Sequence, residues 1–259
     1  RAAELNVDIQ KINSLGGNLI KAADVDLYAK ANENGSFANQ EVLKITTQKN
    51  PILIFGAGAG GNTVKEALEI INSFEVVCFV DDNKDLGPVA KGKPLFGRHQ
   101  LEYLRTIGVK SAFVAIANSQ IRIKTQNYLD ALGFNIETIV HTNAFVSPSA
   151  KIGKGSFIKA GSVIETNCVI GSSCIIDNNT TIAHDSTIGD GVHLAPNSAT
   201  GGFVEIGSFS IIGIGSSIAT GIKIGKHVIT SLGTSVIKDI PDQSIFEGVP
   251  GKLIGKRII

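Results

Sequence analysis

His184 and Asp185 form an adjacent pair that could carry out acid–base chemistry. An imidazole, with an ordinary pKa of about 6.5, can take up a proton near neutral pH, and a neighbouring carboxylate can orient it. His193 follows nine residues later, and Gly202 lies eighteen residues beyond His184. If residues eighteen apart are stacked, Gly202 leaves an open space beside the ring, with a backbone N–H facing it. Such an arrangement could accept a carbonyl carbon and stabilise an oxyanion there.

A second candidate site is a glycine-rich run directly after the apolar segment 51–55. Its glycines are Gly56, Gly58, Gly60 and Gly61. Glycines let the backbone approach a phosphate, and the N-terminus of a following helix supplies free N–H groups. Asp81 and Asp82 end the next apolar segment, where a carboxylate can bind ribose hydroxyls. The pattern predicts nucleotide binding, against the alternative of a purely structural tight turn. A mononucleotide fits better than a redox dinucleotide, because the segment holds only half of the usual six-stranded sheet.

The strongest pattern in the sequence is a six-residue repeat of aliphatic residues. These are Val146, Ile152, Ile158, Ile164, Ile170, Ile176, Ile182, Ile188, Leu194, Ile206, Ile212, Ile218, Ile224 and Val236, with threonine at 200 and 230. The pair Ile-Gly also recurs every eighteen residues, from 152–153 to 224–225. Six residues make one short strand and a turn, and three such sides return the chain to its starting corner. The repeat predicts a triangular parallel β-helix of about five coils, in which inward side chains stack.

The residues before this repeat alternate strand-like and helical segments. Strands are expected at 51–55, 76–80, 112–116 and 136–140, and helices up to about 72, over 100–106 and over 119–132. This alternation predicts a parallel sheet of about four strands, resembling half of a Rossmann fold. The expected organisation is an N-terminal arm of unknown role (1–49), an α/β half-Rossmann domain (50–140), an all-β domain with the parallel β-helix fold (141–240) and a C-terminal cap and tail (241–259).

The composition argues against several classes of protein. A net charge of +1 over 259 residues gives no basic surface for nucleic acid or for an anionic membrane. No apolar stretch is long enough to span a bilayer, and no charged-then-apolar leader opens the sequence. Cys168 and Cys174 occupy the same place in successive repeats and form no metal-type pair, so they are expected to be buried core thiols. Together these features predict a cytoplasmic protein without a metal.

Taken together, these motifs resemble a known family. The repeats, the pair at 184–185, His193 and the ending at 247–252 (EGVPGK) resemble the left-handed β-helix acyltransferases. The preceding nucleotide-binding half-domain narrows the resemblance to the group of bacterial UDP-4-amino-sugar N-acetyltransferases, perosamine N-acetyltransferases and sialic-acid O-acetyltransferase-like proteins. It covers about 50–259 and implies a left-handed coil, an exception to the usual crossover rule.

The resemblance also implies roles for individual residues. The histidine matching His184 is the general base of that family, and its acidic neighbour, here Asp185, orients it. Acetyl-CoA is the co-substrate, with no bound cofactor, and lies in a groove between adjacent subunits that corresponds here to His193, Gly202, Ile214, Leu232 and Gly233. The nucleotide sugar would contact Gly56, Gly58, Gly60, Gly61, Asp81, Asp82 and Asn118. Family members often carry a histidine within the glycine loop, where this chain has Gly60, so sugar recognition there departs from the pattern.

We therefore expect an N-acetyltransferase acting on a nucleotide-linked amino sugar, such as a 4-amino-4,6-dideoxy sugar, for surface glycan or glycoprotein biosynthesis. The alternatives are an O-acetyltransferase of sialic acid or a related sugar, and a non-catalytic β-helix binding protein. A zinc enzyme would need three convergent histidines, but the third candidate, His227, falls at a different place on its coil than His184 or His193. A nucleotide-sugar oxidoreductase would use the glycine run and leave the β-helix unexplained.

A triangular prism of this kind is expected to form a homotrimer. Outward positions such as Phe157, Val163 and Ile211 are apolar, so an isolated prism would expose a large apolar surface. Three prisms packed about a three-fold axis would bury such faces and create three equivalent grooves.

Overall fold

The computed structural model describes residues 43, 45, 47–83, 86 and 89–258. The chain divides into two compact units: unit 1 comprises 1–116 and 128–135, and unit 2 comprises 117–127 and 136–259. The division falls inside helix α5 (Ser119–Ala131). The predicted arm at 1–49 lies almost wholly outside the described residues. None of the helices in the described part of the chain combines the length and the apolar character needed to cross a membrane.

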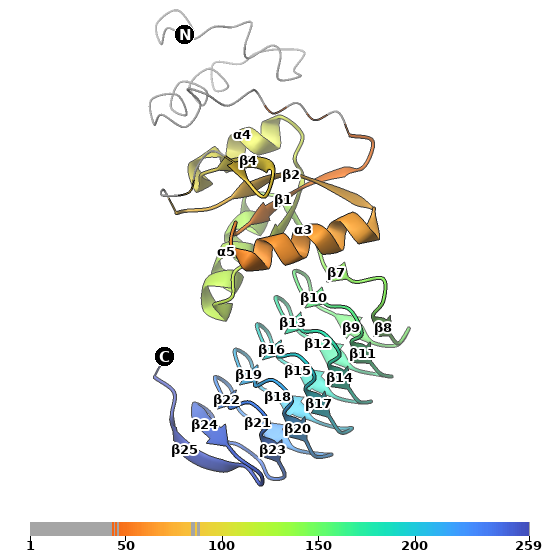
Figure 1. Ribbon diagram of the computed structural model, residues 1–259, viewed down its shortest axis with the longest axis vertical. Helices are drawn as coiled ribbons and strands as arrows, with labels where there is room; N and C mark the ends of the chain where they lie inside the picture. Colours follow the sequence, from red (N-terminus) through yellow and green to blue (C-terminus); the bar gives the residue numbers. More distant parts are fainter. Residues whose placement is uncertain (1–42, 44, 46, 84–85, 87–88, 259) are drawn as a thin grey trace, which may run out of the picture. The chain divides into compact units, whose positions relative to one another are not determined.

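Unit 1 is built on a six-stranded sheet with the order β3-β4-β2-β1-β5-β6. Its central strands β1 (Asn50–Phe55), β2 (Phe74–Val80) and β5 (Ser111–Val114) are parallel and mostly buried, as expected for a sheet covered on both faces. Helix α3 (Ala59–Ile71) packs along β1 and β2 (Figure 1). A 3-10 turn, η1 (Arg98–Gln100), leads into α4 (Leu101–Thr106). The predicted strand–helix alternation is confirmed for these elements.

Two predictions about this sheet are wrong. First, it has six strands rather than about four, because the hairpin β3 (Val89–Ala90) and β4 (Lys93–Phe96) adds to one edge and its short polar-flanked strands give little periodic signal. Second, the strand expected at 136–140 is two strands. β6 (Asn135–Ile136) ends the sheet of unit 1, whereas β7 (Ile139–Val140) pairs with the β-helix, which therefore begins before residue 141.

Unit 2 is a parallel β-helix with three sides of stacked short strands (Figure 1). Side 1 consists of β7, β10 (Phe157–Ile158), β13 (Ile175–Ile176), β16 (His193–Leu194), β19 (Ile211–Ile212), β22 (Ile229–Thr230), β24 (Ser244–Glu247) and β25 (Lys252–Lys256). Side 2 consists of β8 (Phe145–Val146), β11 (Val163–Ile164), β14 (Thr181–Ile182), β17 (Ala199–Thr200), β20 (Ser217–Ile218) and β23 (Ser235–Val236). Side 3 consists of β9 (Lys151–Ile152), β12 (Val169–Ile170), β15 (Thr187–Ile188), β18 (Glu205–Ile206) and β21 (Lys223–Ile224).

The two C-terminal strands extend side 1. β24 pairs in parallel with β22, and β25 returns antiparallel along β24. The segment predicted as a cap and tail thus continues the sheet before the chain ends. Pairing of this kind covers the ladder edge that the last coil would otherwise leave open.

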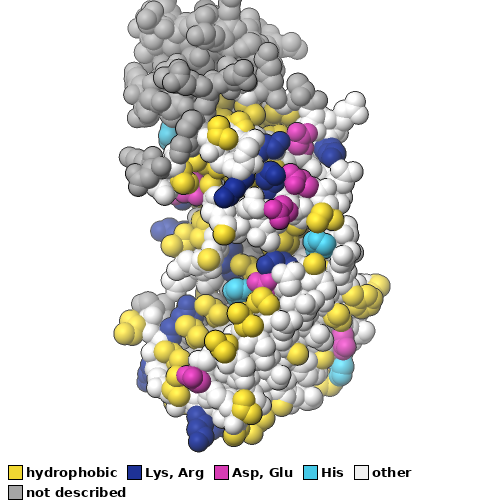
Figure 2. All heavy atoms as spheres, in the orientation of Figure 1, with side chains coloured by type: hydrophobic (Ala, Val, Ile, Leu, Met, Phe, Trp, Pro, Cys, Tyr) yellow, Lys and Arg dark blue, Asp and Glu magenta, His cyan; other side chains and the backbone are white. Residues whose placement is uncertain are grey.

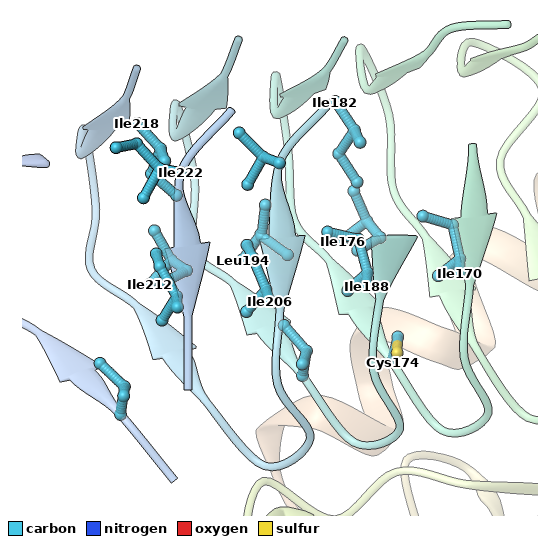
Figure 3. Close-up of a cluster of buried hydrophobic side chains, with 14 of the residues drawn as sticks. Ile170, Cys174, Ile176, Ile182, Ile188, Leu194, Ile206, Ile212, Ile218 and Ile222 are labelled. Atoms are coloured by element: carbon cyan, nitrogen blue, oxygen red, sulfur yellow. The ribbon is translucent and has the colours of Figure 1, made fainter. Parts of the chain in front are cut away.

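The second residue of most strands points into the prism and forms columns of aliphatic side chains (Figure 3). Ile170, Ile188 and Ile206, for example, are at most 2% exposed. Burying each such side chain stabilises the fold by about 1.5–3 kcal/mol. Cys168 and Cys174 lie in this core as free thiols, which confirms their predicted burial, and burial raises the pKa of Cys174 to about 12.

The two threonines that interrupt the aliphatic repeat also point inward. Thr200 is 6% exposed and its hydroxyl accepts the backbone N–H of Ala183 at 3.2 Å. Thr230 is 2% exposed and accepts the N–H of Gly213 at 2.9 Å. In both cases the hydroxyl tethers the first residue of a turn in the preceding coil. The threonine in the core therefore supports a particular turn, and the first of these turns carries His184.

The first half of α5 belongs to unit 2 and is tied to the coils by Arg122. This side chain is 1% exposed, and its Nε and Nη2 donate to the carbonyls of Ser173 at 3.0 Å and Gly191 at 3.3 Å. Burial lowers the pKa of the guanidinium to about 10. Because the partners are carbonyls of two successive coils, Arg122 fixes this first half of α5 to the corner between sides 3 and 1.

Candidate active site

His184 lies in a tightly held turn at the corner between sides 2 and 3. Three features fix its backbone. The N–H of Ala183 donates to Thr200 in the next coil, and the N–H of His184 donates to Oε2 of Glu165 in the preceding coil at 2.9 Å. Asp185 has a φ of 56°, in the left-handed region that asparagine and aspartate tolerate better than most residues. The turn therefore presents the imidazole from a defined position.

The imidazole and the neighbouring carboxylate are in direct contact. Nδ1 of His184 lies 2.8 Å from Oδ2 of Asp185. Hydrogen bonds from His184 first, and from Asn167 second, hold the pKa of Asp185 below its ordinary value. An ionised carboxylate only accepts hydrogen bonds, so Nδ1 of the neutral ring carries the hydrogen and Nε2 carries the lone pair. The His184 side chain is 50% exposed, which leaves this lone pair accessible.

The space above Gly202, which was expected to be open, is filled by the imidazole ring of His184. A Cβ at Gly202 would lie 2.6 Å from Cε1 and 2.8 Å from Nε2 of His184. Gly202 is thus needed so that the imidazole can lie across the next coil, which corrects the idea of a vacant pocket there. Phe203 adds an edge-on ring contact, with centroids 5.2 Å apart, and is 57% exposed. Together the glycine and the phenyl ring shape one side of the accessible imidazole.

His193 lies on side 1, in a small charged cluster. Its Nε2 is 3.3 Å from Oδ2 of Asp177, whose Oδ1 accepts from Nζ of Lys159 at 2.5 Å. Burial alone would raise the pKa of the Asp177 carboxyl, but the hydrogen bonds from His193 and Lys159 outweigh it and hold that pKa below its usual range. With Nε2 donating to the carboxylate, neutral His193 has its Nδ1 lone pair available as an acceptor.

The residues predicted to bind acetyl-CoA fall on three separate parts of the prism. Gly202 lies at the His184 corner, between sides 2 and 3, and that corner is opposite side 1, where His193 lies. Ile214, Leu232 and Gly233 lie at the corner between sides 1 and 2. Two of these are exposed apolar side chains, Ile214 at 55% and Leu232 at 79%. Within one chain the structure therefore does not bring the predicted acetyl-CoA residues together.

The three histidines considered for a zinc site are separated in the same way. His227 lies at the corner between sides 3 and 1, stacked on Phe209 with the ring centroids 4.9 Å apart. Within one chain, His184, His193 and His227 therefore occupy three different positions around the prism. The described residues contain no group of three or more His, Cys, Asp or Glu side chains placed to hold a metal ion.

The glycine run joins β1 to α3, and the structural need for glycine differs from one position to the next. Gly56 has a φ of 110°, and a Cβ there would lie 2.8 Å from the carbonyl oxygen of Ala115. A Cβ at Gly61 would lie 2.1 Å from the carbonyl oxygen of Gly56. Gly60 is less constrained, and a Cβ at Gly58 would meet nothing within 4 Å. Gly56 and Gly61 are therefore required by backbone packing, whereas Gly58 has free space beside its α-carbon.

The two aspartates at the end of β2 have different partners. Asp81 accepts the backbone N–H of Ala57 in the glycine run at 2.8 Å. Asp82 forms an ion pair with Arg98, with Nη2 2.7 Å from Oδ2 and Nε 3.1 Å from each oxygen. The Arg98 guanidinium also lies over the ring of Phe55, 4.9 Å from its centroid. Asp81 thus shapes the loop. Arg98, which the sequence did not single out, is a neighbour of the carboxylates predicted to bind ribose.

Asn118 caps helix α5. Its Oδ1 accepts the backbone N–H groups of Gln120 and Ile121, both at 3.0 Å. This is the usual arrangement at a helix N-terminus, where the first N–H groups lack partners within the helix. The capping explains the residue type at 118, and its predicted contact with a nucleotide sugar stays a prediction.

Two further residues at the His184 corner were missed by sequence reasoning. Glu165 binds the His184 backbone, and Asn167 donates from Nδ2 to Oδ1 of Asp185 at 3.1 Å. The signal that could have found them is the eighteen-residue repeat, which places 165–167 directly before 183–185 in the stack.

Family models match both units of the chain. The PglD N-terminal domain matches residues 51–129, and the bacterial transferase hexapeptide model (six repeats) matches residues 167–202.

Solved structures match most of the chain. A mutant perosamine N-acetyltransferase from Caulobacter crescentus, in complex with CoA and GDP-perosamine, is 32% identical with a TM-score of 0.76, covering 80% of this chain and 97% of that one. The acetyltransferase domain of PglB from Neisseria gonorrhoeae FA1090 is 28% identical (TM-score 0.72), covering 80% and 100%. WeeI from Acinetobacter baumannii AYE is 27% identical (TM-score 0.69), covering 78% and 99%.

Proposed function

Since this chain belongs to the family of hexapeptide-repeat, left-handed β-helix acetyltransferases that includes perosamine N-acetyltransferase, we propose that it transfers the acetyl group of acetyl-CoA to the amino group of a nucleotide-linked sugar. It is an acetyltransferase, and similar structures were solved in complex with CoA or acetyl-CoA. The observation that carries the proposal is the accessible imidazole of His184, held by Asp185 at 2.8 Å over the backbone of Gly202.

The chemistry follows from the orientation of that ring. The neutral amine of the sugar attacks the thioester carbon, while Nε2 of His184 takes up the proton that the nitrogen loses. The C–S bond then breaks, and the CoA sulfur leaves and is protonated by the imidazolium. A positioned base of this kind contributes roughly 10²–10⁴-fold to the rate. Asp185 stabilises the imidazolium, and the backbone N–H of Gly202 is proposed to donate to the developing oxyanion.

The sugar nucleotide is proposed to bind at the carboxyl end of the sheet in unit 1. Parallel α/β sheets bind ligands at this end, and the helix N-terminus after the glycine run offers N–H groups to a phosphate. Gly58 has free space for such an approach. The sugar we propose is a 4-amino-4,6-dideoxy sugar used for surface glycans or glycoproteins, and the reaction would take place in the cytoplasm, where acetyl-CoA is available.

We further propose that the active site is shared between copies of this chain in a homotrimer. His184 and His193 lie on opposite parts of one prism, so a site that uses both needs two chains. From β10 to β22, the outward positions of side 1 are apolar except for His193, and they include the half-buried Ile175 and Ile211. Side 3, by contrast, carries Lys151, Glu205 and Lys223. Figure 2 shows groups of hydrophobic side chains on the surface of unit 2. Apolar surface of this kind favours association through side 1.

One apolar residue does not contribute to that argument. Phe157 was expected to be exposed on the outside of the prism, but it is only 5% exposed within a single chain. Its burial is therefore already complete, and the association rests on the other residues of side 1. Light scattering on the purified protein should give close to three times 27.2 kDa. A stable and active monomer would exclude the shared site and leave the β-helix assignment intact.

The proposed reaction can be tested directly. The protein is incubated with acetyl-CoA and a panel of UDP-, dTDP- and GDP-linked 4-amino sugars, and thiol release is followed. Release with an amino sugar, and none with the corresponding 4-hydroxy sugar, is expected. CMP-sialic acid is included because thiol release with this compound alone would indicate O-acetylation instead. Acetyl-CoA binding without any thiol release across the panel would favour a non-catalytic protein.

A further inference from the structure

At the His184 corner, the residues in the left-handed conformation of successive turns stack in a column. Asn167 and Asp185 are successive members of this column, with φ values of 59° and 56°. They are linked by the hydrogen bond from Nδ2 of Asn167 to Oδ1 of Asp185, at 3.1 Å. Below them, the backbone N–H of Asn167 donates to Oγ of Ser149 at 3.0 Å. The contact between Asn167 and Asp185 thus joins two coils directly beneath the imidazole.

The two oxygens of the Asp185 carboxylate have separate partners. Oδ2 meets Nδ1 of His184, and Oδ1 meets the amide of Asn167. A carboxylate on a short exposed side chain can rotate, and each rotation would lose or weaken the contact with the ring. A second donor on the other oxygen opposes that rotation. Hydrogen-bonded partners of this kind fix the orientation and tautomer of a histidine through the group that it contacts.

The turn itself has no need of an amide at this position. Other turns of the same β-helix have glycine in the left-handed position, as at Gly155, Gly161 and Gly191. The side chain of Asn167 is also exposed, so it contributes little to the core. What distinguishes Asn167 from these glycines is the contact that its side chain makes with Asp185.

We propose that Asn167 is a positioning residue for the acetyl transfer: it holds the Asp185 carboxylate so that His184 keeps its hydrogen on Nδ1 and its lone pair on Nε2. This inference rests on the proposed function of His184 as the base. Asn167 lies one coil away from the ring and acts on it through Asp185, without touching the reacting atoms itself.

The first test is Asn167→Gly, which removes the amide and suits the left-handed backbone. We expect kcat to fall about tenfold, as for a modest misplacement of a catalytic group, with the KM of both substrates within about twofold of the wild-type values. Asn179→Gly is the matched control, because Asn179 is exposed and has a φ of 58° in a turn at another corner. The control should keep wild-type turnover and stability. Unchanged kcat in Asn167→Gly would overturn the proposal.

A double-mutant cycle tests whether Asn167 acts through Asp185. In an Asp185→Ala background the amide has nothing left to hold, so adding Asn167→Gly should lower kcat no further. Independent, multiplicative effects of the two substitutions would show that Asn167 works by another route and would refute the inference. Asn167→Asp keeps the size but replaces the donor by an acceptor, so it should reduce kcat at least as much as Asn167→Gly.

A spectroscopic measurement separates this inference from the proposed function. Nitrogen-15 NMR of the histidine side chains distinguishes the two neutral tautomers without any turnover. We expect hydrogen on Nδ1 of His184 in the wild-type protein and a shift toward hydrogen on Nε2 in Asn167→Gly. If no amino sugar is acetylated, the proposed function fails whatever the NMR result. If acetylation occurs but the tautomer is the same in both proteins, only the role of Asn167 fails.

Discussion

Replacement of His184 by alanine should lower kcat by roughly 10²-fold or more, because it removes the only group proposed to take up the amine proton. The KM values for acetyl-CoA and for the sugar nucleotide should change little, since the imidazole lies at an exposed turn and contributes little to the core. Steady-state kinetics with thiol detection measures both quantities. Wild-type-like turnover would rule out His184 as the base.

Two further variants serve as comparisons for the expected effect of His184→Ala. Asp185→Asn keeps the size of the side chain but weakens the interaction with Nδ1, so its loss in kcat should be smaller than that of His184→Ala. His141→Ala removes a histidine from the first coil, where its Nδ1 accepts the N–H of Asn143 at 3.1 Å. It should leave turnover unchanged, which would show that losing a turn histidine is not in itself harmful.

Replacement of Gly202 by alanine should also lower kcat by on the order of 10²-fold, through the position of the ring rather than its removal. The new methyl carbon would lie 2.6–3.1 Å from three ring atoms of His184, closer than carbon and nitrogen atoms approach without bonding. The ring is a side chain and can swing away, so the fold should survive with a displaced base. Circular dichroism and the unfolding temperature should stay close to wild type while kcat falls.

The test of this steric account is the combination with His184→Ala. Once the ring is absent, the methyl group of Gly202→Ala has free space and should have little further effect. A large additional loss of activity in the double variant would mean that the steric contact is not the whole effect, and that alanine also disturbs the backbone N–H proposed to bind the oxyanion.

Much of the β-helix could be predicted because one constraint repeats. Each strand contributes an inward residue and each coil returns after eighteen residues. An exception at one position therefore does not hide a repeat that many other positions follow. The predicted boundary of the β-helix is wrong where the repeat meets a different pattern. β7 belongs to the first coil, but its apolar residues follow β6 so closely that the two strands appear as one segment.

The candidate site was predictable to the extent that it follows the same repeat. His184 with Asp185 are neighbours in sequence, and Gly202 is one coil away. Glu165 and Asn167 are equally regular, one coil earlier. The pair of Asp82 with Arg98 is different, because it joins two segments of unit 1 through a turn that carries no periodicity. Contacts of that kind depend on the path of the chain between strands, which composition and spacing leave open.

The stacking of eighteen-residue coils also constrains how the length of this chain can vary. Inserting or deleting one residue within 146–236 would turn every later inward side chain toward solvent, because strand side chains alternate. A change of six residues would restore the inward columns but would move the later turns to a different corner. Only a whole coil leaves His184, Gly202 and side 1 in the same relation to one another. Variation in length should therefore be accepted in steps of eighteen residues, and most readily before 165, where an extra coil lengthens the prism without separating Asn167, Asp185 and Gly202.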